Sequence, residues 1–195
     1  QTRCAGQEHH DGPAQERTLI FDGAELELMR IRVQTRIAYD RVVPSTLSYM
    51  EPLQPGGSRP RPITLGQKNG IWRINGLTYV EKQTPIVVKR GQIETWEIRN
   101  LPPTMPHPFH IHGFLFRVIS RNNSPAHVSR VADRTTGITV TDLGWKDTVL
   151  VWPGETVRIV IDFSHPHLGD QVYMVHCHNM EHEDGAMMLN LKVTG

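Results

Sequence analysis

Six of the chain's eleven histidines are concentrated in two short segments. The first segment is 107–113, with the sequence HPFHIHG, and the second is 176–187, with the sequence HCHNMEHEDGAM. A single histidine in a protein is usually a packed residue held by backbone groups, but imidazole and thiolate are also strong transition-metal ligands. Histidines gathered in this way around a cysteine predict metal binding.

Strand parity divides these residues into two groups. Side chains on a strand alternate between its two faces, so His110 and His112 share one face, and the two histidines beside Cys177 also share a face. Cys177 points the opposite way from its neighbours, as His107 does from His110. If the two segments lie side by side, Cys177 and His107 face inward and two separate metal sites result. The outer site then has four imidazoles, those of His110, His112, His176 and His178.

The inner site draws on Cys177, His107 and His182, and a loop of five residues from cysteine to histidine can return to the same ion. Met187 lies five residues further on. Two imidazoles, one thiolate and a weak axial thioether are the ligands of blue (type 1) copper centres, in which soft sulfur stabilises Cu(I). Zinc would not need the methionine. Because the thiolate must be deprotonated to bind, metal affinity is expected to fall in acid.

These segments must be positioned by β-strands, since no helical periodicity long enough for a crossover helix occurs. Gly and Pro separate most of the predicted strands, which favours an all-β fold, an antiparallel Greek-key sandwich. The strands are expected at 71–74, 85–89, 93–99, 114–120, 148–152, 156–163, 171–176 and 187–193.

The N-terminal third is organised differently. Residues 26–33 alternate with period two and predict one strand, but residues 44–62 are so rich in Pro and Gly that we interpret them as a linker. An isolated strand lacks the sheet that a stable strand requires, so this one is left without a partner unless it pairs onto the edge of the sandwich. We therefore divide the chain into a terminal segment, 1–43, the linker, and one domain, 63–195.

Composition excludes several classes of partner. The chain has 21 basic and 20 acidic residues, and the short basic run at 59–62 lacks interleaved aromatics, so nucleic acid is not expected as a partner. No apolar stretch approaches the roughly 20 residues of a membrane span. Cys4 and Cys177 cannot form a disulfide framework. The compartment stays open, with a periplasmic or extracellular location favoured.

The two histidine segments resemble the third and fourth copper-binding motifs of the multicopper oxidases, the family of laccases, bilirubin oxidases and spore-coat laccases. The similarity extends to WRING at 72–76, ETWEIRN at 94–100, GWKDT at 144–148 and PGE at 153–155. Residues 60–195 thus resemble the C-terminal, third cupredoxin domain of this family. The strand at 26–33 is similar to the strand that closes the preceding domain.

The resemblance implies a role for each residue. His107, Cys177, His182 and Met187 match the type 1 copper ligands, where electrons from the donor enter. His110 matches a type 2 ligand. Type 3 ligands are matched by His112, His176 and His178. Glu183 matches an acidic residue that helps to deliver protons to the oxygen being reduced, and we favour this role over the alternative of an exposed surface glutamate.

One departure limits this expectation. The family's three-copper cluster takes eight histidines, and this chain supplies four, because His165-Pro166-His167 lacks the following glycine. The remaining ligands are expected from an N-terminal part of the same oxidase, or from a second copy whose four histidines meet these across a symmetry axis.

Two functions are therefore considered. The first is a laccase-like oxidase that takes single electrons from phenols or aromatic amines and passes four to dioxygen. The second is a carrier module that holds one blue copper and has no oxygen chemistry. Since no methionine-rich insertion is present, organic donors are favoured over copper(I).

Overall fold

The computed structural model describes residues 29–32, 34, 42–46, 49, 51, 53–57 and 59–195. These residues fall into two units, 1–47 and 48–195. Of the strand expected over 26–33, residues 29–32 carry no regular secondary structure, and the others lie outside the described residues, as does Cys4. The assignment of this segment to a preceding domain stays a prediction.

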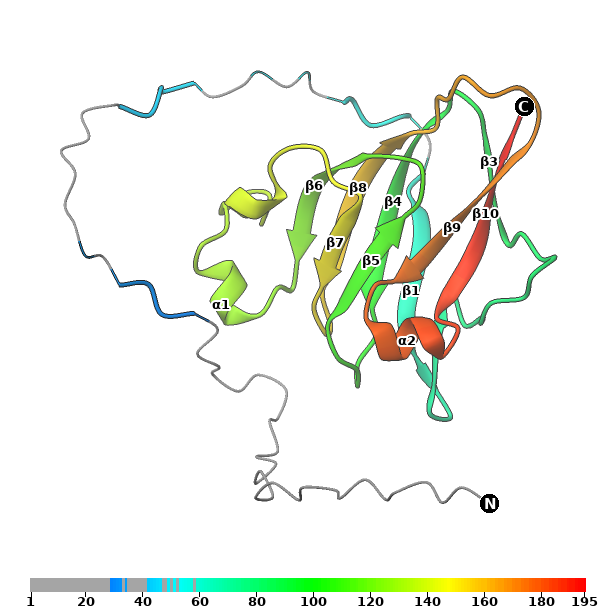
Figure 1. The fold of residues 1–195 in the computed structure, drawn as a ribbon, viewed down its shortest axis with the longest axis horizontal. Coiled ribbons are helices and arrows are strands. Elements are labelled where there is room, and N and C mark those ends of the chain that lie inside the picture. Colours follow the sequence, from blue (N-terminus) through cyan, green and yellow to red (C-terminus); the bar gives the residue numbers. More distant parts are fainter. Residues whose placement is uncertain are drawn as a thin grey trace, which may run out of the picture. The chain divides into compact units, whose positions relative to one another are not determined.

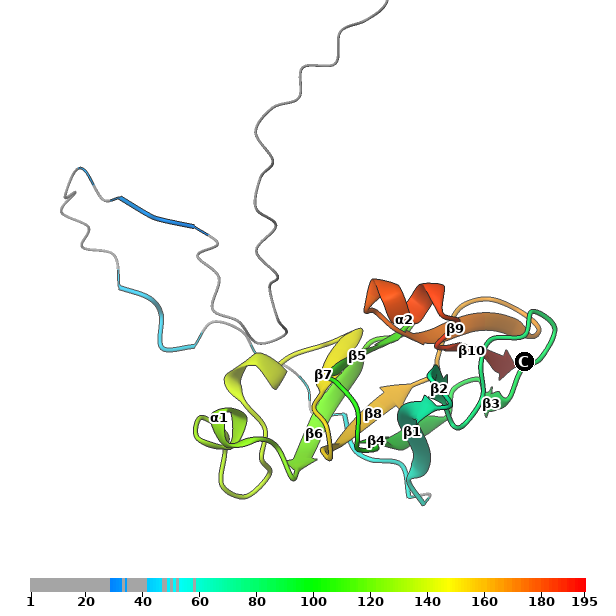
Figure 2. The ribbon, with the colours of Figure 1, turned by 90° about the horizontal axis from the view of Figure 1, so that it is seen from below.

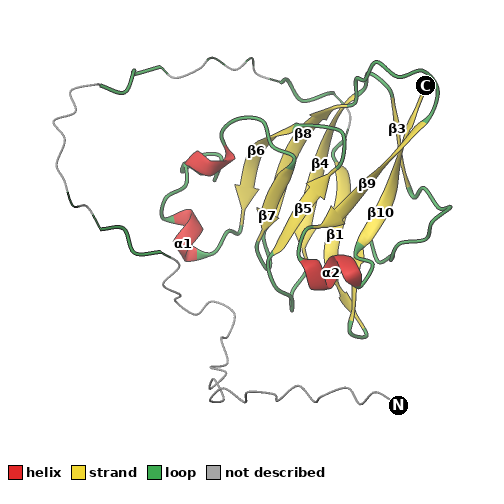
Figure 3. Ribbon diagram, viewed as in Figure 1, coloured by secondary structure: helices red, strands yellow, loops and turns green. Residues whose placement is uncertain are grey.

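The second unit is a sandwich of two five-stranded sheets, seen from its face in Figures 1 and 3 and from below in Figure 2. In sheet A the spatial order is β2 (Ile71–Ile74), β1 (Arg61–Lys68), β4 (Ile93–Asn100), β8 (Thr156–Asp162) and β6 (Phe116–Asn122). In sheet B it is β3 (Ile86–Lys89), β10 (Met188–Thr194), β9 (Gln171–Cys177), β5 (His107–Ile111) and β7 (Thr148–Val151). Short helices are α1 (Ala126–Ser129), η1 (Val140–Asp142) and α2 (Met180–Asp184). None of the described helices is long and apolar enough to cross a membrane.

Strand alternation produces the core. Trp96 of β4 packs between Phe109 of β5 and Phe163, with ring centroids 6.4 Å and 5.7 Å away, and all three rings are fully buried. Because these rings come from both sheets, they fill the space between the layers. The expected β-sandwich, of cupredoxin-like type, is confirmed.

Two strand pairs correct the antiparallel expectation: β1 with β4, and β3 with β10, are parallel. Between β1 and β4 the chain passes through sheet B as β3, and it therefore re-enters sheet A in the original direction. No part of β1 was predicted, because the expected strands began at 71 and Pro60 and Pro62 favoured a linker over 44–62. The shorter β2 pairs only with residues 65–68, so Pro62 lies where the strand has one partner and its missing N–H costs little.

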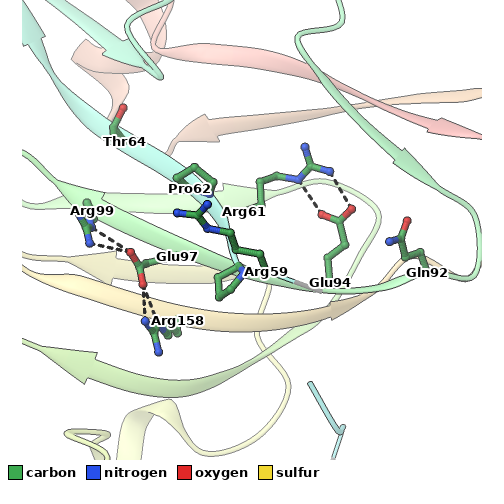
Figure 4. Close-up of a pocket in the computed structure, with 10 residues that line it drawn as sticks. Arg59, Arg61, Pro62, Thr64, Gln92, Glu94, Glu97, Arg99 and Arg158 are labelled. Atoms are coloured by element: carbon green, nitrogen blue, oxygen red, sulfur yellow. Dashed lines mark hydrogen bonds and ion pairs between the residues drawn. The ribbon is translucent and has the colours of Figure 1, made fainter. Parts of the chain in front are cut away.

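Charged side chains line the side of sheet A that is shown in Figure 4. Arg61 makes a two-pronged ion pair with Glu94, whose carboxylate also accepts a hydrogen bond from the Trp96 indole at 2.8 Å. Next to it, Glu97 accepts from Arg158 and Arg99. These pairs fix the strands β1, β4 and β8 relative to one another.

A buried ionic network attaches the long connection after β6. Arg121 bonds both oxygens of Asp142, at 2.9 and 2.8 Å, and Oε2 of Glu155 at 3.0 Å. Burial alone would raise the pKa of Asp142, but the hydrogen bonds from Arg121 and Thr139 reverse this and hold that pKa below its ordinary value. The network therefore depends on all three charges being present.

Candidate metal centre

Two neighbouring strands bring the two histidine segments together. β5 and β9 pair antiparallel, with Phe109 opposite Cys177 and His110 opposite His176. Cys177 and His107 are fully buried between the sheets, whereas His110 is only partly buried. The structure thus places these residues on the faces that parity predicted.

The inner group consists of Cys177, His107 and His182. The sulfur lies 3.5 Å from Nδ1 of His107 and 3.4 Å from Nδ1 of His182, and these two nitrogens are 3.1 Å apart. The centre of such a triangle is about 2 Å from each corner, close to the length of metal–imidazole bonds and slightly below that of metal–thiolate bonds. One transition-metal ion fits this donor set.

A helix, and not the expected loop, returns the chain to the inner group. α2 begins two residues after His178, and His182 on its last turn is 2% exposed. The N–H of Met187 then donates to the carbonyl of His182 at 2.9 Å, and the N–H of Cys177 donates to the carbonyl of Met187 at 3.1 Å. Met187 is fully buried, and its backbone hydrogen bonds to Cys177 and His182 place it beside the inner group.

Two residues to which no role was assigned from the sequence also contact this group. The hydroxyl of Thr104 lies 2.9 Å from Nε2 of His107 and 3.4 Å from the carbonyl of Met105. If the hydroxyl donates to that carbonyl, it accepts the Nε2 proton and leaves Nδ1 free to bind metal. The second residue is Trp72, whose ring packs on His182.

Burial sets the protonation of the inner group. It lowers the pKa of His107 to about 4, with a smaller contribution from His182, so this imidazole is neutral at physiological pH. Burial also raises the pKa of the Cys177 thiol to about 11, since a thiolate without a counter-charge is poorly solvated there. A metal that binds the thiolate must therefore displace a proton.

The outer group lies on the other face of the same two strands. One ring nitrogen from each of His110, His112 and His176 falls within 4.8 Å of the others, and Nε2 of His112 is 3.0 Å from Nε2 of His176. The His178 ring centroid is 5.4 Å from those of His110 and His176. Four imidazoles therefore face one region, with His178 at its margin.

Hydrogen bonds orient the outer imidazoles. Nδ1 of His110 lies 2.9 Å from the hydroxyl of Thr148 and 3.0 Å from the carbonyl of Asp147. Nδ1 of His176 lies 3.1 Å from the carbonyl of Cys177. When Nδ1 carries the proton, Nε2 is left unprotonated for a metal. Burial lowers the pKa of His112 and His176, which keeps them neutral.

Glu183 lies beside the outer group. Its Oε2 is 3.5 Å from Nδ1 of His176, and its side chain is 40% exposed. The carboxylate is thus in contact both with an outer histidine and with solvent.

Comparison with known proteins places the chain in a family. The family model that matches residues 53–195 is described as multicopper oxidase. Bilirubin oxidase of Albifimbria verrucaria is 33% identical over 156 residues, which cover 78% of this chain and 25% of that protein. Multicopper oxidase mco of Staphylococcus epidermidis is 29% identical over 189 residues, which cover 93% of this chain and 38% of that protein.

Solved structures agree. The McoA multicopper oxidase of Aquifex aeolicus superposes with a TM-score of 0.69 at 38% identity, over 81% of this chain and 34% of that one. The chain therefore spans roughly a quarter to two fifths of the length of these relatives. Because the match takes in both histidine segments and the sandwich that positions them, the chain belongs to the multicopper oxidase family and carries a cupredoxin-like domain of it.

Proposed function

We propose that this chain supplies the type 1 copper site and half of the ligands of the three-copper cluster of a laccase-like oxidase. Such an oxidase takes one electron at a time from phenolic or aromatic donors and reduces dioxygen to water. One observation carries the proposal: Cys177 belongs to the buried inner group, and its neighbours His176 and His178 belong to the outer group. A single strand thus joins the two groups.

The protein's part at the inner site is to hold a fixed and dry donor set. Copper, when bound there, supplies a one-electron couple whose potential the soft sulfur ligands tune. Thr104 fixes the tautomer of His107, and the buried sandwich excludes water from Cys177 and His182. A rigid donor set changes little between the two oxidation states, which favours rapid electron transfer.

The path between the groups is short. From the sulfur of Cys177, covalent bonds lead to both flanking imidazoles, and the hydrogen bond from Nδ1 of His176 to the Cys177 carbonyl closes a second route at 3.1 Å. Electrons entering at the inner site would reach the outer histidines through these connections.

The outer group is incomplete as it stands, because a three-copper cluster of this family needs eight histidines and the described residues bring four to this face. The relatives are much longer than this chain, which supports a missing domain of the same oxidase as the source of the others. Glu183, in contact with His176 and with solvent, is suited to deliver protons to the oxygen being reduced.

Copper stoichiometry tests this proposal. We expect about one tightly bound copper per isolated chain, with a blue absorption band, and about four in the complete oxidase. A colourless chain, or loss of the blue band only when His110 is changed, would contradict the inner assignment.

The alternative is a blue-copper carrier without oxygen chemistry, which the incomplete outer group favours for the isolated chain. Oxygen uptake coupled to oxidation of a phenolic dye distinguishes the two functions. Oxygen uptake by the complete oxidase that is lost in His176→Ala supports the oxidase function. One-electron exchange with the dye without oxygen uptake supports the carrier function.

A further inference from the structure

One indole ring contacts both imidazoles of the inner group. Trp72 lies on β2 at the edge of sheet A, whereas His107 and His182 belong to β5 and α2. The Trp72 ring centroid is 4.2 Å from that of His182, with 35° between the planes, and 5.2 Å from that of His107, with 75° between them. At 4.2 Å the indole and the His182 imidazole are in van der Waals contact.

Burial makes this contact informative. Cys177 and His107 have no exposed surface and His182 is 2% exposed, so an organic donor in solvent cannot touch the ligands directly. Trp72 packs against the core but is only partly buried, so the residue that contacts His182 also has some surface in solvent. Thr104 also reaches His107 and is partly buried, but a hydroxyl group offers no aromatic face.

We propose that Trp72 is the donor-contact residue, on whose exposed part an aromatic donor stacks and through which its electron passes to His182. This inference rests on the proposed function. A phenol bound there loses one electron, its hydroxyl proton passes to water, and the electron reduces copper(II) at the inner site to copper(I). The indole remains neutral, since it acts only as the contact between the donor ring and the imidazole.

An electron carrier without a donor-binding surface would use Trp72 differently, as packing that closes the end of the sandwich. The two roles differ in one respect. Packing predicts that an added aromatic molecule leaves Trp72 unperturbed, whereas the donor-contact role predicts contact between the two rings.

A binding experiment that needs no turnover separates these roles. The chain is loaded with copper(I), labelled with ¹⁵N and titrated with 1,4-dimethoxybenzene, which has no phenolic proton to lose. The indole resonance of Trp72, assigned with Trp72→Phe, is expected to shift on titration. The resonance of Trp145, a 45% exposed tryptophan that contacts Arg117, serves as the control and is expected to stay in place. An unmoved Trp72 resonance overturns the proposal.

Reduction kinetics provide the second measurement. In the copper-loaded protein, Trp72→Leu is expected to slow reduction of the copper by a phenol about three- to tenfold, because loss of one aromatic pair corresponds to a change of that size. Reduction by hexacyanoferrate(II), which has no aromatic ring, should change by less than about twofold. Equal slowing of both donors, or of neither, contradicts a stacking role.

The variants are compared only after their copper content and blue band match those of the parent. If Trp72→Leu does not fold, Trp72→Phe and the titration decide the question by themselves. A chain that binds no copper refutes the proposed function. A blue chain whose Trp72 resonance does not shift on addition of 1,4-dimethoxybenzene refutes only this inference.

Discussion

Replacing Thr104 with Val tests whether the inner site is set up by a hydroxyl group outside the ligand set. Valine has nearly the same shape, so the substitution removes only the hydroxyl and its two contacts, at 2.9 Å to Nε2 of His107 and at 3.4 Å to the carbonyl of Met105. Since His107 is fully buried, no water can replace the lost partner. The consequence differs between the metal-free and metal-bound states.

In the metal-bound state Nδ1 of His107 would be a ligand, and the proton would have to reside on Nε2, where it lacks an acceptor in the valine variant. Leaving a buried donor unpaired costs about 1–3 kcal/mol. In the metal-free state the imidazole can move its proton to Nδ1, within 3.1 Å of His182, and avoid part of that cost. The difference between the states weakens metal binding, and loss of such a supporting contact typically lowers affinity roughly 10- to 100-fold, or about 1.4–2.7 kcal/mol.

The assay is competition for copper(I) between the chain and a chromophoric chelator. Thr104→Ser keeps the hydroxyl and is expected to retain most of the affinity. Thr194→Val removes a hydroxyl that donates to the Val88 carbonyl on β3, away from the ligands, and serves as the matched control. Thr104→Val binding as tightly as the parent, or Thr104→Ser binding as weakly as the valine variant, would refute the reasoning.

Three further predictions concern charge and the axial ligand. Arg121→Ala leaves two buried carboxylates unpaired and should lower the free energy of unfolding by about 3–5 kcal/mol in urea titrations. The matched Arg158→Ala removes an ion pair whose arginine side chain is 45% exposed and should cost less than about 1 kcal/mol, so equal losses would contradict the network's importance. Because the pKa of Asp142 is lowered on folding, its contribution to the free energy of unfolding is present above roughly pH 4 and is lost as pH falls through the pKa of the folded state. Asp142→Asn should therefore weaken the dependence of the free energy of unfolding on pH in acid, and an unchanged dependence would contradict this. Met187→Leu should keep the blue band and raise the reduction potential, since loss of the thioether destabilises Cu(II), and a lowered potential would exclude Met187 as axial ligand.

Parity made the division into two groups accessible from sequence. The placement of Cys177 and His107 inside and His110 outside follows from local backbone geometry alone, which requires only that both segments be strands. Most strand positions could also be predicted from the sequence, because the strands are short and bounded by Gly or Pro. The prolines at the start of β1 prevented its prediction, since the sequence does not reveal that β1 has a neighbouring strand on one side only at Pro62.

The contacts that organise the site were not accessible in this way. Trp72 and His182 are far apart in sequence and come from opposite ends of the domain, and no periodicity relates an edge strand of one sheet to a helix beside the other. Thr104 lies in a proline-rich connection where a hydroxyl has many possible partners. Such contacts depend on how the two sheets pack, which binary patterns of polar and apolar residues do not specify.

The same geometry explains why one cysteine can serve two sites without being shared by them. Because successive side chains on a strand point to opposite faces, the thiol of Cys177 and the imidazole of His176 lie on opposite faces although the two residues are adjacent in the chain. The inner face is dry and surrounded by core residues, which suits a soft donor set that changes oxidation state without rearranging. The outer face is partly exposed, and under the proposed function it would accept ligands from another domain and dioxygen. A loop or helix carrying the same three residues would not separate the two environments by a single peptide unit, so under the proposed function the end of β9 both insulates and connects electron entry and oxygen chemistry.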